Sequence, residues 1–214
     1  MKTRLIIIIA IWVGFTGTLL AQGGTTTTVT TSTTTTSQQP KLIKKTFPHF
    51  TVSPYGGAIF PLPKVLNQNF KPGGNFGMDL GVRINKEVGL FAKFGYDFMA
   101  SKINGAPIGS YFEFSGGPRY YFMNPKLKSQ LFFEAGLGAY YFRQNSYNDP
   151  SGVNGGVINQ IVNTKPGLSG GAGASLYLSD AVDILIKSDY HVVFTPNGTS
   201  SFMTVGAGFD FSFK

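Results

Sequence analysis

The chain has 214 residues, enough for one domain with an appendage, and its lack of cysteine excludes disulfide scaffolds, thiolate metal sites, cysteine nucleophiles and lipid attachment to cysteine. Only 13% of the residues are charged, about half the usual share, while 28 are glycine, 20 phenylalanine and 10 tyrosine, a composition unsuited to a helical enzyme or a disordered tail. The formal net charge of +8 comes from scattered basic residues, so we expect no binding of nucleic acid.

Residues 1–21 have the three parts of a secretory signal peptide. Lys2 and Arg4 form the basic start, Leu5–Val13 is an unbroken apolar run, and Ala21 ends a stretch suited to cleavage. A spanning helix needs roughly 20 apolar residues. The run is therefore too short for a permanent anchor, and we expect this segment to be removed.

Residues 22–48 form a linker of low complexity. Ten of the 13 residues 25–37 are threonine, and such a stretch cannot bury a core, so we expect a flexible tether. The tether would pass near the cell-wall layer, a candidate ligand, although no residue there indicates binding. The folded domain is then expected over residues 49–214.

From Phe50 onward, apolar and polar residues alternate with a period of two, and no useful stretch has a helical period. The first segment, 50–60, is the least regular because Pro54 lies inside it. Strict alternation indicates strands with one apolar and one polar face. The seven regular segments are 75–84, 88–98, 111–122, 131–143, 166–178, 182–194 and 202–213.

Three features place the polar face inside a barrel rather than on the surface of a soluble sandwich. The apolar stretches have the length of tilted membrane strands, about 9–11 residues. Tyrosine and phenylalanine gather at their ends, as in the aromatic girdles of outer-membrane barrels. The polar face mixes glycine and serine with charges of both signs, which suits a narrow interior.

The connections between the predicted strands alternate between long and short, as expected for external loops and periplasmic turns. Because every backbone polar group in hydrocarbon needs a partner, spanning strands must close without an edge. The sequence therefore predicts an all-β fold: an eight-stranded antiparallel up-and-down transmembrane β-barrel, surrounded by outer-membrane lipid. The long connections are 61–74, 99–110, 144–165 and 195–201, and the short ones are 85–87, 123–130 and 179–180.

The strand series, the segment Gly116–Phe122 (GGPRYYF) and the aromatic ending Phe209–Phe213 (FDFSF) resemble the OmpA/OmpX-like superfamily of small outer-membrane β-barrels. The resemblance covers the chain from Phe50 to Lys214. It implies that the alternating C-terminal strand is a signal for the barrel-assembly machinery. In this chain Lys214 follows the terminal aromatic residue, which departs from the family pattern.

Charged side chains on the predicted inner face are the candidate functional residues. A lone buried charge is very costly, so we expect them to pair in a structural plug, and the alternative is an ion-conducting path. The candidates are Asp79, Arg83, Lys93, Asp97, Glu113, Arg119, Glu134, Asp183, Lys187, Asp189, His191 and Asp210.

Catalysis and metal binding have little support in the sequence. His191 is the one reasonable base, and Asp189 could orient it, but no serine occupies the next position on the same face. The distant His49 gives no metal-ligand spacing. Gly170–Gly173 lies inside a strand and favours close packing, not a phosphate loop. We expect no enzyme, no cofactor and no metal site.

The leading hypothesis is therefore an outer-membrane barrel with a structural or surface-interaction role. An extracellular ligand would contact the long polar connection at residues 144–165. Two alternatives remain open at this point. One is a narrow porin for small solutes, and the other is a soluble, lipocalin-like carrier with the same alternation turned inside out.

Overall fold

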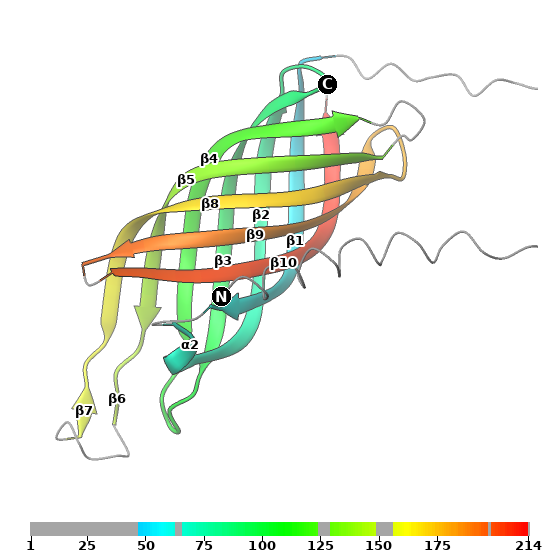
Figure 1. The fold of residues 1–214 in the computed structure, drawn as a ribbon. Helices are drawn as coiled ribbons and strands as arrows, with labels where there is room; N and C mark the ends of the chain where they lie inside the picture. The colour runs from blue at the N-terminus through cyan, green and yellow to red at the C-terminus, as the bar shows by residue number, and fades with distance from the viewer. Residues whose placement is uncertain (1–46, 63–65, 124–128, 149–155, 197, 214) are drawn as a thin grey trace, which may run out of the picture. The chain divides into compact units, whose positions relative to one another are not determined.

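The computed structural model describes residues 47–62, 66–123, 129–148, 156–196 and 198–213. The predicted signal peptide and nearly all of the predicted linker lie outside these ranges. Within them, eight strands close into one antiparallel barrel, and each strand pairs with its neighbours around the ring (Figure 1). The predicted eight-stranded barrel is confirmed. Its strands are β1 (His49–Pro61), β2 (Phe70–Arg83), β3 (Val88–Ser101), β4 (Gly109–Met123), β5 (Gln130–Gln144), β8 (Ile161–Tyr177), β9 (Val182–Thr195) and β10 (Gly198–Phe213).

The two ends of the barrel differ. At one end lie the short helix α2 (Leu66–Asn69) and a small hairpin of β6 (Tyr147–Asn148) and β7 (Val157–Ile158), as Figure 1 shows. This end, called the loop end, carries the connections 62–69, 102–108, 145–160 and 196–197. The opposite turn end carries the connections 84–87, 124–129 and 178–181. Among the described residues, no helix is long and apolar enough to cross a membrane.

Several strands reach further toward the loop end than the alternation predicted. β2 begins at Phe70, β8 at Ile161 and β10 at Gly198. The last connection is therefore a two-residue turn between Thr195 and Gly198, and the expected long loop is wrong there. The reason is that backbone pairing continues beyond the apolar band, where side chains no longer need to alternate.

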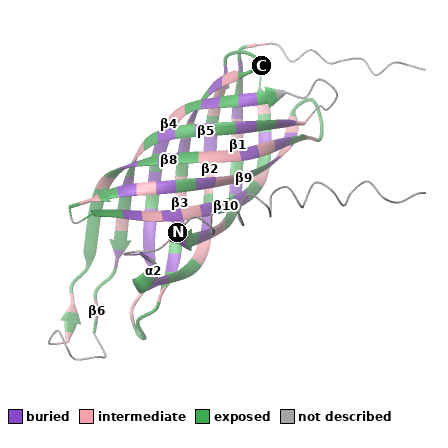
Figure 2. Cartoon of the chain, in the orientation of Figure 1, coloured by how far each residue is buried: buried purple, intermediate pink, exposed green. Residues whose placement is uncertain are grey.

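Each strand of the barrel has one buried and one exposed face, seen as alternating bands in Figure 2. The apolar face is the outer one: Leu137 is 71% exposed and Phe114 56%. The polar face is the inner one: Lys93 is 1% exposed and Asp79 is fully buried. A contiguous apolar surface of this kind marks a membrane or partner interface. The arrangement does not fit the inside-out carrier, which needs a polar outer face.

The barrel interior is layered along its length. Apolar side chains fill it near the loop end and form the loop-end cluster, and a second apolar group lies toward the turn end. Ring contacts hold each layer together: Tyr111 stacks on Phe202 with 5.4 Å between ring centroids, and Tyr121 is tilted against Phe132 at 5.9 Å. The loop-end cluster consists of Ile59, Leu66, Phe70, Met99, Tyr111, Tyr140, Val193 and Phe202, and the second group of Tyr121, Phe132 and Leu185.

Candidate functional site

All twelve charged and histidine candidates have buried side chains inside the barrel. Six of them meet in one network, here called the charge cluster: Asp79, Lys93, Arg119, Glu134, Lys187 and Asp189. These residues come from β2, β3, β4, β5 and β9, so the network joins strands that are distant in sequence. Alternation brings each of them to the inner face, and closure of the barrel brings them together.

Lys93 and Arg119 link the acidic residues on one side of the charge cluster. Lys93 Nζ donates to Glu134 Oε1 at 2.9 Å and to Asp189 Oδ2 at 2.6 Å. Arg119 donates from Nε to Glu134 Oε2 at 2.7 Å and from Nη2 to Asp79 Oδ2 at 2.6 Å. Each cation therefore has two carboxylate partners, which offsets its desolvation.

Lys187 completes the charge cluster. Its Nζ donates to both carboxylate oxygens of Asp79 at 2.9 Å and lies 3.7 Å from Asp189 Oδ2. The network thus holds three cations and three carboxylates, and its formal charges cancel. Balanced, hydrogen-bonded ion pairs are the form in which charges can be buried.

The remaining strands fill the space around the charge cluster. Tyr55 of β1 places its ring 3.6 Å from Lys187 Nζ, a cation–π contact. Ser53 of the same strand donates to Asp210 Oδ1 at 2.6 Å and joins β1 to β10. β8 contributes Gly171, whose missing side chain leaves room for the Asp189 carboxylate. β1 and β8 therefore pack directly against the charge cluster, and Ser53 links β1 to β10.

Gly171 offers a direct test of this packing. A Cβ there would overlap the Asp189 carboxylate and come within 2.8 Å of the Ser188 carbonyl oxygen. We expect Gly171→Ala to lower the free energy of unfolding by about 1–3 kcal/mol, the usual cost of overpacking. Urea unfolding of the barrel in lipid vesicles measures this difference in the free energy of unfolding.

Its neighbour Gly170 provides the matched control. Gly170 is exposed, and the nearest atom to an added Cβ is the Glu134 carbonyl oxygen at 3.9 Å. Gly170→Ala should change the free energy of unfolding by less than about 0.5 kcal/mol. Equal effects of the two substitutions would contradict the packing described for the Asp189 carboxylate.

A second polar group lies between the charge cluster and the loop-end cluster. His191 Nδ1 lies 3.0 Å from Tyr140 Oη and 3.6 Å from Glu113 Oε1, and its Nε2 lies 3.3 Å from Thr204 Oγ1. The Phe202 ring stacks on the imidazole at 4.5 Å. His191 is fully buried. These contacts hold the imidazole among packed interior side chains.

The sequence offered Asp189, a neighbour on the same face, as a residue that could orient His191. In the structure the Asp189 carboxylate pairs with Lys93 in the charge cluster. The hydrogen-bonding contacts of His191 are with Tyr140 and Thr204. The described residues contain no group of three or more histidine, aspartate or glutamate side chains able to hold a metal ion.

Four of the twelve candidates lie outside the charge cluster and the His191 group. Arg83 Nη2 donates to the Lys86 carbonyl at 2.6 Å, and its guanidinium stacks on a tyrosine ring at 3.9 Å. Asp183 accepts a hydrogen bond from Ser175 at 2.8 Å. Asp210 is the acceptor of the Ser53 hydroxyl. Asp97 is buried, and in the described ranges no ion pair joins it to the charge cluster.

Part of the interior on β1 and β10 was not predicted from the sequence. Tyr55 and Ile59 face inward with His49, the first residue of the predicted barrel domain, which is 4% exposed. Phe202 is fully buried in the loop-end cluster. The alternation that indicates them is present, because His49, Thr51, Ser53, Tyr55 and Ile59 are spaced by even numbers of residues and are all buried.

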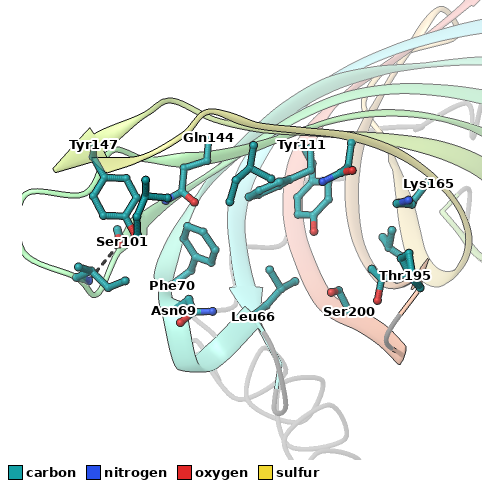
Figure 3. Close-up of a pocket in the computed structure, with 17 residues that line it drawn as sticks. Leu66, Asn69, Phe70, Ser101, Tyr111, Gln144, Tyr147, Lys165, Thr195 and Ser200 are labelled. Atoms are coloured by element: carbon teal, nitrogen blue, oxygen red, sulfur yellow. Dashed lines mark hydrogen bonds between the residues drawn. The ribbon is translucent and has the colours of Figure 1, made fainter. Parts of the chain in front are cut away.

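A pocket of about 530 Å³ opens above the loop-end cluster. Figure 3 shows Lys165 and Thr195 on one side of it, Gln144 and Tyr147 on the other, and Phe70 and Leu66 nearby. Its lining combines apolar and aromatic side chains with a few polar ones, as in small-molecule sites. Several lining residues belong to the loop-end cluster, so the pocket stands directly on it.

No protein-family model and no curated protein matches the sequence. Among solved structures, the barrel is similar to the Neisserial surface protein A, with a TM-score of 0.56 at 13% identity over 77% of this chain and 97% of that one. The chain has the fold of the OmpA/OmpX-like outer-membrane β-barrels.

Two other solved structures similar to this barrel come from Pseudomonas aeruginosa. The N-terminal β-barrel domain of OprF gives a TM-score of 0.49 at 16% identity, covering 76% of this chain and 97% of that one. The outer membrane protein OprG gives 0.48 at 11% identity, covering 78% and 96%. The eight-stranded barrel fold that the resemblance implies is confirmed by the closed strand order and by the likeness to the Neisserial protein.

Proposed function

We propose that this OmpA/OmpX-like barrel resides in a bacterial outer membrane, anchors the chain there and presents its loop end outside, with its lumen closed by side chains. The charge cluster carries the proposal. Three cations and three carboxylates from five strands fill the middle of the barrel with direct hydrogen bonds. An eight-stranded barrel is just wide enough for side chains to fill it.

The outer surface supports residence in lipid. Large apolar side chains on every barrel strand are exposed, including Phe50 on β1, Leu137 on β5 and Phe213 on β10. A membrane-embedded barrel needs such an apolar band, and its closed ladder leaves no unpaired backbone in the hydrocarbon. In this proposal residues 1–21 are removed as a signal peptide, and β10 is the signal that the barrel-assembly machinery reads.

A surface-interaction role is supported by the extension of β5 and β8. The ladder between them continues to Gln144 and Ile161, and the β6–β7 hairpin follows. Val157 on that hairpin is 62% exposed, and Val162 on β8 is 45% exposed. Apolar side chains on an otherwise polar extension are typical of a contact surface.

The proposal includes no catalysis and no pore. His191 is the only base that the sequence offered for hydrolysis, and it is buried beneath Phe202. A solute would have to pass the loop-end cluster, the charge cluster and the group around Phe132 in turn. No observation in the described part of the barrel favours the narrow-porin alternative over a closed lumen.

Solute permeation through liposomes tests the closed lumen. The protein purified from membranes is reconstituted in liposomes loaded with small sugars and ions, and folding is checked by heat-shifted gel mobility. We expect leakage no greater than from protein-free liposomes, while an open porin in parallel releases the solutes. Size-limited leakage that is lost on boiling the protein would overturn the closed lumen and favour the porin.

A further inference from the structure

The loop-end pocket is blind. Leu66, Phe70, Tyr111 and Val193 line it, and each of these side chains is at most 5% exposed and belongs to the loop-end cluster. Beneath them, Phe202 stacks on Tyr111 and on the buried His191. A molecule that enters from the loop end therefore contacts a closed apolar layer and cannot pass further into the barrel. The pocket can hold such a molecule at this level.

The pocket has one charge. Lys165 is the single charged side chain among its lining residues, and it is half-buried. In the described ranges no carboxylate pairs with its ammonium group. A half-buried cation without an ion-pair partner is available to a ligand anion, which would gain a charge-assisted hydrogen bond.

The surroundings of the pocket carry the same sign of charge. Within four residues of the loop-end connections, the described part of the chain contains Lys71, Lys102 and Arg143 and no acidic residue. The described carboxylates lie instead in the lumen or in the connections of the turn end. Over the full sequence of the same connections Lys64 adds one positive charge and Asp149 one negative charge, so the balance at this end stays positive and long-range attraction favours anions.

We propose that the loop-end pocket binds an amphipathic anion, whose apolar chain lies on Leu66, Phe70, Tyr111 and Val193 and whose anionic group meets Lys165. The volume of about 530 Å³ is in the range of sites for small molecules. Polar rim residues such as Ser200 and Asn163 supply further hydrogen-bonding groups. The ligand is either a free fatty acid or a lipid with an anionic head group, which share this chemistry.

Calorimetric titration of decanoate into the protein in lipid nanodiscs, with empty nanodiscs as the blank, tests the pocket. We expect saturable binding at one site, weaker for shorter chains by about fourfold per methylene. Lys165→Gln should weaken it by about tenfold, the loss of a hydrogen bond to a charged group. Lys71→Gln removes an exposed charge at the same end but outside the pocket, so only a screened long-range attraction is lost and the affinity should fall by less than about twofold.

A second variant keeps the test valid if Lys165→Gln does not fold, a failure that the loss of heat-shifted gel mobility would show. Lys165→Glu should bind decyltrimethylammonium in preference to decanoate. Mass spectrometry of small molecules released from the purified protein separates the two sources, because a free acid and a head-group-bearing lipid differ in mass. Binding no greater than that of empty nanodiscs, or equal losses in Lys165→Gln and Lys71→Gln, would overturn the proposal.

Discussion

Replacing Asp79 with asparagine should lower the free energy of unfolding by about 3–5 kcal/mol, the usual result of removing one partner from a buried ion pair. Asp79 accepts hydrogen bonds from Arg119 and from Lys187. The asparagine keeps the shape of the side chain and removes its charge. Both cations would then be buried with an excess positive charge, which a low-dielectric interior disfavours.

Glu87→Gln is the control for this substitution. Glu87 is exposed in the β2–β3 turn, so losing its charge should change the stability by less than about 0.5 kcal/mol. Urea unfolding in lipid vesicles, followed by the gel shift of the folded barrel, gives both values. Equal stability of Asp79→Asn and the native protein would mean that the charge cluster does not hold the interior together.

Arginine on the outer face should also be costly. Met78 follows Gly77 and precedes Asp79 on β2, and its side chain points outward with 38% exposure. Met78→Arg should destabilise the barrel in lipid by about 2–4 kcal/mol, the cost of a cation near the bilayer midplane. The expected reason is desolvation of the guanidinium in hydrocarbon, not lost packing inside the barrel.

Ile108→Arg is the matched substitution outside the proposed hydrocarbon band. Ile108 is a 54% exposed apolar residue in the connection before β4 at the loop end. Its replacement should cost no more than about 1 kcal/mol, as found near the membrane interface. Vesicle-based unfolding measures both variants. If Met78→Arg lowered the free energy of unfolding no more than Ile108→Arg does, the outward face of the barrel would not be in contact with lipid.

The sequence predicted which residues face the lumen because side-chain direction in a strand depends only on local parity. Lys93 and Arg119 were placed inside on this ground, and both are buried. Their partners could not be predicted, since these depend on the stagger of the closed barrel. Lys93 and Asp189, for example, are 96 residues apart and meet only because β3 and β9 face each other across the interior.

The prediction was poorest where the alternation is interrupted or ends. Pro54 obscured the pattern of β1, so the inward positions of Tyr55 and Ile59 were missed. At the loop end, β10 pairs with β9 as far as Gly198, and a small hairpin extends β5 and β8. Backbone ladders of this kind impose no apolar pattern, and the sequence therefore gives no sign of where they stop.

The most direct test of a lipid-embedded barrel with a polar interior is to measure which face of its strands contacts lipid. The only tryptophan of the chain is Trp12, so Trp12→Phe gives a barrel background without tryptophan. On β3, Phe94 is 43% exposed and points outward, whereas Phe91 is 5% exposed and points inward. A single tryptophan is placed at each of these two positions, and the protein is refolded into lipids that are brominated in the acyl chain. Bromine quenches the fluorescence of a nearby tryptophan, so the quenching reports which face contacts hydrocarbon.

We expect strong quenching of Phe94→Trp and weak quenching of Phe91→Trp, with both variants keeping their heat-shifted gel mobility. Phe132→Trp on β5, another buried inward position, provides a second interior site if Phe91→Trp fails to fold. Equal quenching at the inward and outward positions, or stronger quenching inside, would contradict a lipid-embedded barrel with a polar, closed interior.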